Sequence, residues 1–189
     1  MRVIAGTYRS RALKAPEGLA TRPTSDRLRE TLFNVLALRI EGAAFLDLYA
    51  GSGAVGIEAL SRGAARVEFV EKSAAALATL RENLQALGLR STARVHAVSA
   101  STFLRSIERS AGRERYGIVF MDPPYDADQE YAQTLGLLGA TAHSLLAEGA
   151  VVVAEHRRKE RLEDRYGALA RTRLLEQGDA SLSFYALLE

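Results

Sequence analysis

Residues 45–56 read FLDLYAGSGAVG, and the other elements of the chain can be placed around this stretch. It begins as an apolar run typical of a buried strand, turns at Gly51 and Gly53, and continues as a helix. With Gly56 these glycines fit G-x-G-x-x-G, in which the backbone turns sharply and approaches a ligand closely. The next apolar run ends at Glu71, where a nucleotide site places a carboxylate for ribose hydroxyls. The pattern predicts an adenosine-bearing cofactor, and a plain tight turn is the alternative.

Strands and helices alternate along most of the chain, which predicts an α/β fold with a doubly wound, mostly parallel sheet covered on both faces. The expected strands lie at 44–48, 66–71, 93–98, 118–121 and 150–155. The expected helices lie at 26–38, 54–62, 73–87, 101–109 and 128–146, the last one in two pieces. The tail departs from this alternation, because 169–175 and 181–188 read as an antiparallel pair at the sheet edge.

Composition restricts the classes to which the protein can belong. The chain has 189 residues, of which 48% are hydrophobic, enough for one domain with a full core. It contains no cysteine, which excludes a disulfide framework. No apolar run approaches the ~20 residues of a membrane span, and the N-terminus lacks the apolar region of a signal peptide. Its three histidines have no metal-ligand spacing. We therefore expect a cytoplasmic protein with no membrane association and no metal site.

Positive charge is concentrated near the N-terminus. Residues 1–29 hold seven basic and two acidic side chains, whereas the remaining residues hold 18 basic and 21 acidic ones. Two short extended runs, 2–5 and 12–15, predict a β-hairpin arm whose tip is rich in arginine. Such an arm suits RNA, because arginines bind phosphates and a tyrosine stacks on a base. A solvated edge hairpin remains the alternative. The candidate RNA-binding residues are Arg2, Tyr8, Arg9, Arg11 and Lys14.

A second constellation, Asp122-Pro123-Pro124-Tyr125, follows the fourth expected strand. The two prolines end the strand and stiffen the loop, because their φ angles are fixed and they lack an N–H group. Two acceptors, the Asp122 carboxylate and the Pro123 carbonyl, would stand beside the flat ring of Tyr125. In a doubly wound sheet this loop lies beside the loop after the first strand, at the switch point where ligands bind. It should therefore adjoin the glycine turn.

This set of groups suits a planar ring that carries an exocyclic amine. The two acceptors would take the two N–H bonds while the tyrosine stacks on the ring. An aryl amine is a poor nucleophile, and hydrogen bonds that favour a pyramidal nitrogen would stabilise the cation that forms as a methyl group arrives. Alignment of the nitrogen with the methyl donor would supply much of the remaining rate enhancement. Residues 122–125 are thus candidate catalytic residues, and a stiff loop with a helix-capping Asp122 is the alternative.

Taken together, these motifs resemble class I S-adenosylmethionine-dependent methyltransferases that act on amines. The likeness extends to RVIAGTYRSRAL at 2–13, RPTSDRLRETLFNVL at 22–36, DLYAGSGAVGIEALSRGA at 47–64 and FMDPPY at 120–125. These segments are similar to the bacterial 16S rRNA guanine-N2 methyltransferases that modify guanine 966, and the resemblance covers nearly the whole chain. It implies a Rossmann-like class I methyltransferase sheet, with S-adenosyl-L-methionine as the cofactor and 16S rRNA as the substrate.

The resemblance also implies roles for individual residues. Glu71 would bind the ribose hydroxyls, and the adenine would lie near Ser99, where many class I relatives carry an Asp. Because Ser99 departs from that pattern, recognition of the adenine would rest more on backbone groups. The residues implied to bind the cofactor are Asp47, Gly51, Gly53, Glu71, Lys72, Ser99 and Ala100. The residues implied to shape the lid of the cofactor pocket or the path of the RNA are Arg22, Thr24, Arg29 and Glu30.

We expect two parts, an N-terminal basic β-hairpin extension at 1–21 and a Rossmann-like methyltransferase domain at 22–189. The protein should act as a monomer on rRNA within a small-subunit assembly particle. A nicotinamide oxidoreductase would share the glycine pattern but gives no role to residues 122–125. A DNA adenine-N6 methyltransferase would use the same amine chemistry, although the chain has little room for a sequence-reading domain. A non-catalytic RNA-binding module would leave both constellations unexplained.

Overall fold

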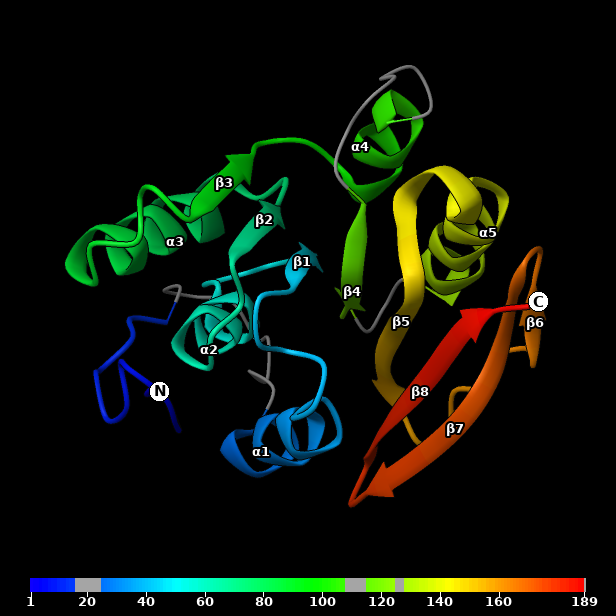
Figure 1. Cartoon of the computed structure of the whole chain (residues 1–189), viewed down its shortest axis with the longest axis horizontal. Helices are drawn as coiled ribbons and strands as arrows, with labels where there is room; N and C mark the ends of the chain where they lie inside the picture. The colour runs from blue at the N-terminus through cyan, green and yellow to red at the C-terminus, as the bar shows by residue number, and fades with distance from the viewer. Residues whose placement is uncertain (16–24, 108–114, 125–127, 189) are drawn as a thin grey trace.

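The computed structural model describes residues 1–15, 25–107, 115–124 and 128–188. Within these ranges helices cover both faces of one eight-stranded sheet (Figure 1). The helices are α1 (Asp26–Val35), α2 (Ala54–Ser61), α3 (Ala74–Ala86), α4 (Ala100–Ile107) and α5 (Asp128–Leu145). The strands are β1 (Ala44–Leu48), β2 (Arg66–Val70), β3 (Ala93–His96), β4 (Tyr116–Met121), β5 (Leu146–Arg157), β6 (Arg165–Tyr166), β7 (Leu169–Gln177) and β8 (Ala180–Leu187).

The strand order is β3-β2-β1-β4-β5-β8-β7-β6, with β1 to β5 parallel and β6 to β8 antiparallel to their neighbours. The predicted α/β class, the mostly parallel sheet and the antiparallel C-terminal pair are therefore confirmed. Strand β1 lies between β2 and β4, and Leu48 at its end is level with Val70 and Met121. The loops that follow these three strands consequently meet at one edge of the sheet.

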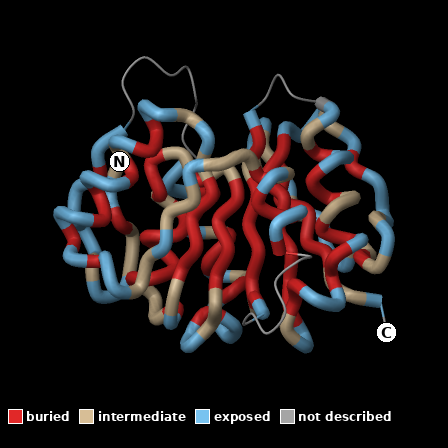
Figure 2. The backbone as a smooth tube through the Cα atoms, turned by 90° about the horizontal axis from the view of Figure 1, so that it is seen from above, coloured by how far each residue is buried: buried red, intermediate tan, exposed pale blue. Residues whose placement is uncertain are grey.

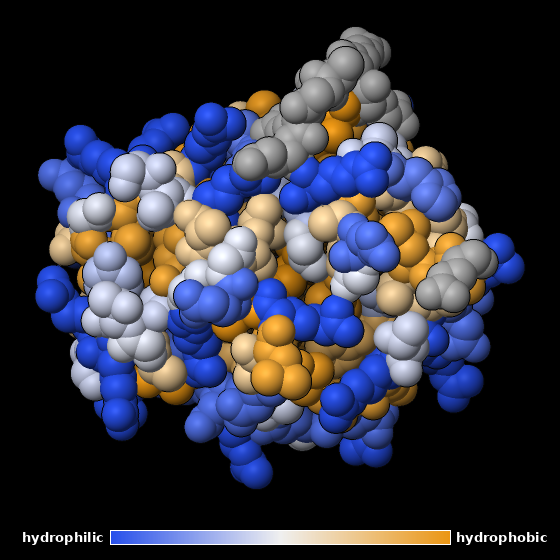
Figure 3. All heavy atoms as spheres, in the orientation of Figure 1, coloured by the Kyte–Doolittle hydropathy of each residue, from blue (hydrophilic) through white to orange (hydrophobic). Residues whose placement is uncertain are grey.

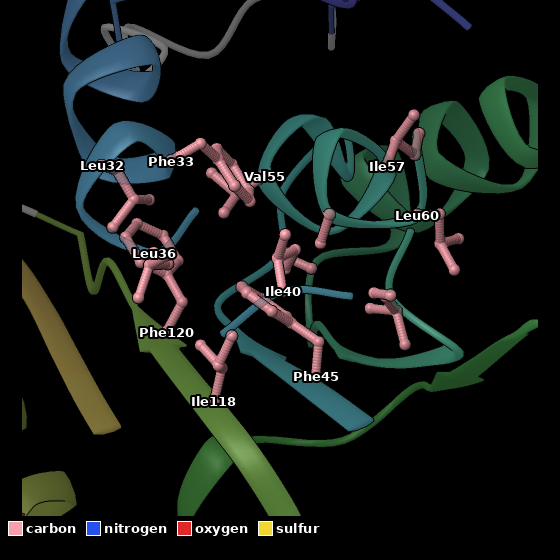
Figure 4. Packing of buried hydrophobic residues seen from close by; sticks show 14 of the residues in the cluster. Leu32, Phe33, Leu36, Ile40, Phe45, Val55, Ile57, Leu60, Ile118 and Phe120 are labelled. Carbon is pink, nitrogen blue, oxygen red and sulfur yellow. The ribbon is translucent and has the colours of Figure 1, made fainter. Parts of the chain in front are cut away.

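Apolar side chains fill the space on both sides of the sheet. Helices α1, α2 and α3 pack on one face, and α4 and α5 on the other. Figure 4 shows Leu32 of α1 and Leu36, which directly follows that helix, near Phe120 of β4. The central strands are buried along most of their length (Figure 2). Full burial of each such side chain contributes roughly 1.5–3 kcal/mol, so these two clusters supply most of the driving force for folding.

Capping side chains and a glycine mark the ends of two of the helices. The Oγ atom of Ser25 accepts a hydrogen bond from the backbone N–H of Leu28 at 3.1 Å, and α1 begins there. Ser73 caps α3 in the same way through the N–H of Ala76. Gly88 follows α3 with a φ angle of 69°, a value that glycine adopts without strain. Among the described residues no helix is long and apolar enough to cross a bilayer.

Three expectations about the second half of the chain were wrong. Helix α5 is one continuous element rather than two, β5 is longer than its apolar run, and β6 was not predicted. One glycine of this helix is required by packing. A Cβ atom at Gly139 would collide with the carbonyl of Tyr166 in β6, so glycine lets this strand approach the helix.

Residues 1–15 form the predicted arm, which we define as the described part of the N-terminal extension. Its two sides pair through backbone hydrogen bonds between Val3 and Arg11, and between Leu13 and Met1. Only one bridge, Arg2 to Ala12, has regular antiparallel geometry, so the arm is a short, irregular hairpin. Val3 and Leu13 are buried in the same cluster as α1 and α2. The arm is thus packed on the domain as part of its core.

Candidate active site

The glycine loop, residues 49–53, carries the chain from β1 into α2. Gly53 has a φ angle of 84°, and its N–H donates to the carbonyl of Ala50 at 2.8 Å. A Cβ atom at Gly53 would collide with Leu80 of α3, and one at Gly56 with the ring of Phe69. Glycine is therefore required here by backbone conformation and by packing. One side of the loop packs closely against α3 and β2, and the opposite side could receive a ligand.

Glu71 closes the glycine loop from the end of β2. Its Oε2 atom accepts a hydrogen bond from the N–H of Gly51 at 2.8 Å, and its Oε1 atom accepts one from the N–H of Ser73 at 2.7 Å. The side chain is half-buried. An ionised carboxylate offers about four lone-pair positions, so two remain for further donors. The carboxylate is held in place before any ligand arrives, and its free positions suit a pair of hydroxyl groups.

Asp47 supports the loop from below. The side chain is 2% exposed, and its Oδ2 atom accepts a hydrogen bond from the N–H of Gly56 at 2.9 Å. Burial raises the pKa of Asp47 to about 7, and the charge of Glu71 acts in the same direction, whereas the Gly56 hydrogen bond opposes both. Asp47 is therefore a buried acid that bonds the first turn of α2 to the end of β1.

Lys72 and α5 meet across the same edge of the sheet. The exposed Lys72 ammonium lies 3.3 Å from a carboxylate oxygen of Glu130. On the next turn of α5, Thr134 is hydrogen-bonded to the hydroxyl of Tyr49 at 2.6 Å. Tyr49 has a φ angle of 65°, unusual for a residue with a Cβ atom, and this conformation directs its ring toward α5. These contacts connect the strand ends of β1 and β2 to α5.

Ser99 and Ala100 begin α4, beyond the end of β3. The Oγ atom of Ser99 accepts a hydrogen bond from the N–H of Thr102 at 3.1 Å, as a helix-capping serine does. Ala100 is buried in the cluster beneath the helix. The Ser99 hydroxyl is therefore already engaged with its own helix, which leaves backbone groups as the main polar features at this position.

Asp122, Pro123 and Pro124 follow β4 directly, at the strand end next to the glycine loop. Because Met121 pairs in register with Leu48 of β1, the Asp122 backbone is one residue beyond that pair. Pro123 is buried and Pro124 is exposed. The φ angles of both prolines are fixed, which restricts the path of the loop. Residues 122–124 and the glycine loop therefore follow adjacent strands, as the sequence predicts.

Glu155 is the acidic neighbour of Asp122 on β5. Met121 pairs in register with Ala154, so Asp122 and Glu155 occupy the next positions of adjacent parallel strands. Glu155 is 2% exposed. The pKa of Asp122 is raised well above its usual range, first by burial and then by the charges of Glu155 and Asp47. Asp122 keeps some exposed surface, so it is an acid in a poorly solvated place that a ligand can still reach.

The arm is bound to α2 through its backbone. Glu58, which is fully buried, accepts hydrogen bonds from the N–H groups of Ile4 and Ala5 at 2.8 and 3.0 Å. Ser61 accepts one from the N–H of Tyr8 at 2.9 Å through its Oγ atom. A Cβ atom at Gly6 would collide with the carbonyl of Ser61, so the tip passes directly over the end of the helix. The arm therefore follows the second half of α2.

The basic side chains of the arm point into solvent. Arg2, Arg9, Arg11 and Lys14 are exposed, whereas Tyr8 is half-buried against the core, so only part of its ring is free. The tip lies at the C-terminal end of α2, about 12 Å along the helix from the glycine loop. On the face seen in Figure 3, hydrophilic side chains surround smaller apolar areas.

Arg29 has a different place from the one that the resemblance implies. It is fully buried, donates a hydrogen bond to the carbonyl of Arg2 at 2.6 Å and pairs with Asp26 at 2.9 Å. It holds the arm against α1 and cannot line an open path for RNA. Arg22, Thr24 and Tyr125 lie outside the described residues. Among the described residues, no cluster of three or more His, Asp or Glu side chains could hold a metal ion.

With this geometry in hand, comparison with known proteins is informative. The family described as "Conserved hypothetical protein 95" matches residues 1–186.

The chain belongs to this family.

Within the family, the chain is 38% identical over 186 residues to the Bacillus subtilis protein named "Putative rRNA methyltransferase YlbH", and the match covers 98% of both chains. It is 44% identical over 125 residues to "Ribosomal RNA small subunit methyltransferase D" of Escherichia coli, which covers 66% of this chain and 60% of that protein. The solved structure of "Putative methyltransferase yhhF from Escherichia coli" superposes with a TM-score of 0.81 at 37% identity, covering 98% of this chain and 96% of the other.

Family membership confirms the resemblance that the motifs indicate, and the protein is a methyltransferase with the expected sheet. The structure also contains buried polar side chains that sequence reasoning missed, among them Glu58, Asn83 and Glu155. Glu58 and Asn83 lie on helices whose apolar stripes dominate the pattern, so both read as outward-facing. Glu155 ends an apolar run, as Glu71 does, and that shared position was the signal that could have found it.

Proposed function

We propose that this protein transfers a methyl group from S-adenosyl-L-methionine to the exocyclic N2 amine of guanine 966 in bacterial 16S rRNA. One observation carries the proposal: the Asp122-Pro123-Pro124 loop and the glycine loop follow strands that pair in register. A donor on one loop and an amine on the other would therefore meet at the switch point of the sheet. The names of the relatives in Bacillus subtilis and Escherichia coli support an rRNA substrate.

The cofactor would lie across the ends of β1, β2 and β3. Glu71 would accept hydrogen bonds from both ribose hydroxyls, since its carboxylate keeps two free positions after binding Gly51 and Ser73. The methionine part would lie against Gly51 and Gly53, above Asp47. The adenine would lie between Lys72 and the start of α4, read by backbone groups near Ser99 and Ala100. When bound, the cofactor supplies the electrophilic methyl group.

The target amine would be held by Asp122 and the Pro123 carbonyl, with Tyr125 as the proposed stacking partner. Both N–H bonds of guanine N2 need acceptors, and the raised pKa of Asp122 marks a carboxyl group that gains from new donors. Pro124 stiffens the loop so that the acceptors keep their direction. Guanine N2 is on the paired edge of a duplex, so the base must come from a loop or be flipped out.

The arm is our candidate for binding the phosphates around the target. Arg2, Arg9, Arg11 and Lys14 are exposed on it, and each phosphate contact releases counterions. We further propose that the substrate is 16S rRNA within a small-subunit assembly particle, that the enzyme acts as a monomer in the cytoplasm, and that Arg22 and Thr24 contribute to the cofactor pocket. The extension at 1–21 would then bind the RNA, and the domain at 22–189 would carry out the methyl transfer.

The decisive experiment is methylation of naked 16S rRNA and of assembly particles, both taken from a strain that lacks this protein, with mapping of the modified base. Methyl transfer to N2 of guanine 966 is the expected result. Transfer to adenine N6 of DNA, added as a parallel substrate, would contradict the proposal, as would RNA binding without any methyl transfer. A faster reaction on particles than on naked rRNA would identify the particle as the substrate.

A further inference from the structure

Asn83 of α3 bonds the arm and the glycine loop at the same time. The side chain is 3% exposed. Its Oδ1 atom accepts a hydrogen bond from the N–H of Lys14 at 2.9 Å, and its Nδ2 atom donates to the carbonyl of Lys14 at 3.1 Å. The second N–H of Nδ2 donates to the carbonyl of Ser52 at 2.9 Å. One amide group therefore joins residue 14 of the arm to the middle of the glycine loop.

The chemistry of this contact requires an amide. Both N–H donors of Asn83 are used, one on each segment, and its oxygen is used on the arm. All three partners are backbone groups, so the contact does not depend on the side chains of Lys14 or Ser52. A buried backbone group that loses its partner costs about 1–3 kcal/mol. If one segment moved, Asn83 could follow it only by breaking its hydrogen bond to the other segment. Movement of either segment is therefore opposed.

The other anchors of the arm differ in this respect. Glu58 and Ser61 bind the arm to the middle and end of α2, and Arg29 binds it to α1. None of the hydrogen bonds of these three side chains reaches the glycine loop, within the part of the chain that the structure describes. Asn83 acts where the arm returns toward the site, at Lys14. It is therefore the direct link between the two binding segments.

We propose that Asn83 is a positioning residue that couples RNA binding by the arm to cofactor binding by the glycine loop. The inference rests on the proposed function, because it needs RNA on the arm and the cofactor on the loop. A ligand that immobilises one segment also immobilises Asn83, and the second ligand then loses less conformational freedom on binding. Each ligand thereby tightens the binding of the other by the same factor.

The test is titration calorimetry with S-adenosylhomocysteine, the unreactive product, in the absence and presence of a saturating RNA hairpin that contains the target guanine. For the wild-type protein we expect RNA to tighten S-adenosylhomocysteine binding about fivefold or more, the lower range of measured couplings. For Asn83→Ala we expect the ratio of the two affinities to fall close to one. Hydrogen exchange of the amides at 50–56 should slow on RNA binding in the wild type and not in the variant.

Glu82→Gln is the matched control. Glu82 is the neighbour of Asn83 on α3 and also binds the arm, through a 2.8 Å exposed ion pair with the Lys14 ammonium. It makes no described contact with the glycine loop, so its variant should keep the wild-type ratio. Asn83→Asp is the second test variant, because aspartate can still accept from the N–H of Lys14 but has no donor for Ser52. Thermal melting of each variant establishes that it is folded at the temperature of the titration.

Three results would overturn the inference. The first is a wild-type protein that binds both ligands with an affinity ratio of one. The second is a folded Asn83→Ala or Asn83→Asp protein that keeps the wild-type ratio, and the third is a Glu82→Gln protein that loses it. In all three the proposed function stands, because both ligands still bind. A wild-type protein that binds no S-adenosylhomocysteine or no RNA overturns the proposed function as well, so the two failures are distinguishable.

Discussion

Glu71 and Asp122 are two carboxyl groups on either side of β1, and their surroundings are opposite. Glu71 accepts hydrogen bonds from two backbone N–H groups, of Gly51 and Ser73. No such backbone donor to Asp122 is described, and burial together with the charges of Glu155 and Asp47 raises the pKa of Asp122. One carboxylate is therefore preorganised by the protein, and the other gains most from donors that a ligand brings.

This difference separates the tasks of the two halves of the site. A cofactor that must be exchanged after every reaction is bound best by groups that are already in place, because little has to be ordered on binding. A target amine is bound best by a carboxyl group whose need for donors grows as positive charge develops on nitrogen.

The largest effect is expected at Asp122. Asp122→Ala should lower the rate of methyl transfer about 100- to 1000-fold, because a charge-directed acceptor at the reacting nitrogen is lost. Its affinity for S-adenosylhomocysteine should stay within about twofold of the wild type, since the cofactor half is intact. Single-turnover rates and calorimetry measure the two quantities. Asp122→Asn keeps one acceptor oxygen and should lose less activity than alanine. If the alanine variant turns over at the wild-type rate, Asp122 has no role in methyl transfer.

Asp47 should control the pH dependence of stability. Since burial raises its pKa from 3.8 to about 7, its contribution is present in full below about pH 4 and is lost as the pH rises through 7. That difference corresponds to roughly 4 kcal/mol as an upper value. Asp47→Asn keeps an acceptor for Gly56 and should be more stable than the wild type at pH 8, with the advantage shrinking toward pH 5. Urea unfolding at both pH values is the measurement, and parallel stability curves would contradict the assignment.

Glu71 should affect the cofactor alone. Glu71→Ala should weaken S-adenosylhomocysteine binding by at least about 10- to 100-fold, since the loss of even one hydrogen bond to a charged group costs roughly 1.5–3 kcal/mol. RNA affinity measured without cofactor should not change. Glu82→Gln, which removes an exposed acid from the outer face of α3, serves as the control and should leave cofactor affinity unaltered. Equal cofactor affinity in the Glu71 variant and the wild type would show that the ribose is bound elsewhere.

The smallest effect is expected from the arm. Neutralising both tip arginines, with Arg9→Gln and Arg11→Gln, should weaken RNA binding and reduce the slope of log affinity against log salt by roughly 1.5 to 2. Cofactor affinity in the absence of RNA should be unaffected. Arg173→Gln removes an exposed charge from β7, far along the sheet, and should leave the slope unchanged. An identical slope for the arm variant would remove the tip from the RNA interface.

Local patterns predicted the central part of this molecule well. The strand Ala44–Leu48 has the predicted bounds, and Ser25 and Ser73 cap the helices that they precede. Glu71 was found from its place at a strand end, and it does close the glycine loop. Such features depend on neighbours within about twenty residues, where hydrophobic periodicity and capping chemistry act directly.

Features that depend on distant partners could not be predicted in this way. Glu58 bonds to backbone groups more than fifty residues earlier, and Asn83 to one 69 residues earlier. Their burial follows from the arm that covers them, and a helical pattern alone makes them look exposed. The same limit applies to the unpredicted β6, whose two residues are a strand only because β7 pairs with them.

The docking of the arm also has a consequence for biosynthesis. The arm is translated before its anchors Glu58, Ser61 and Asn83, which follow it by about 50 to 70 residues. Until then its apolar residues, Val3 and Leu13, have no surface to cover and are available to chaperones. The entropic cost of closing a loop rises only slowly with its length. Docking of the arm is therefore delayed more by translation time than by chain entropy. The arm therefore reaches its native contacts only after α2 and α3 have been made.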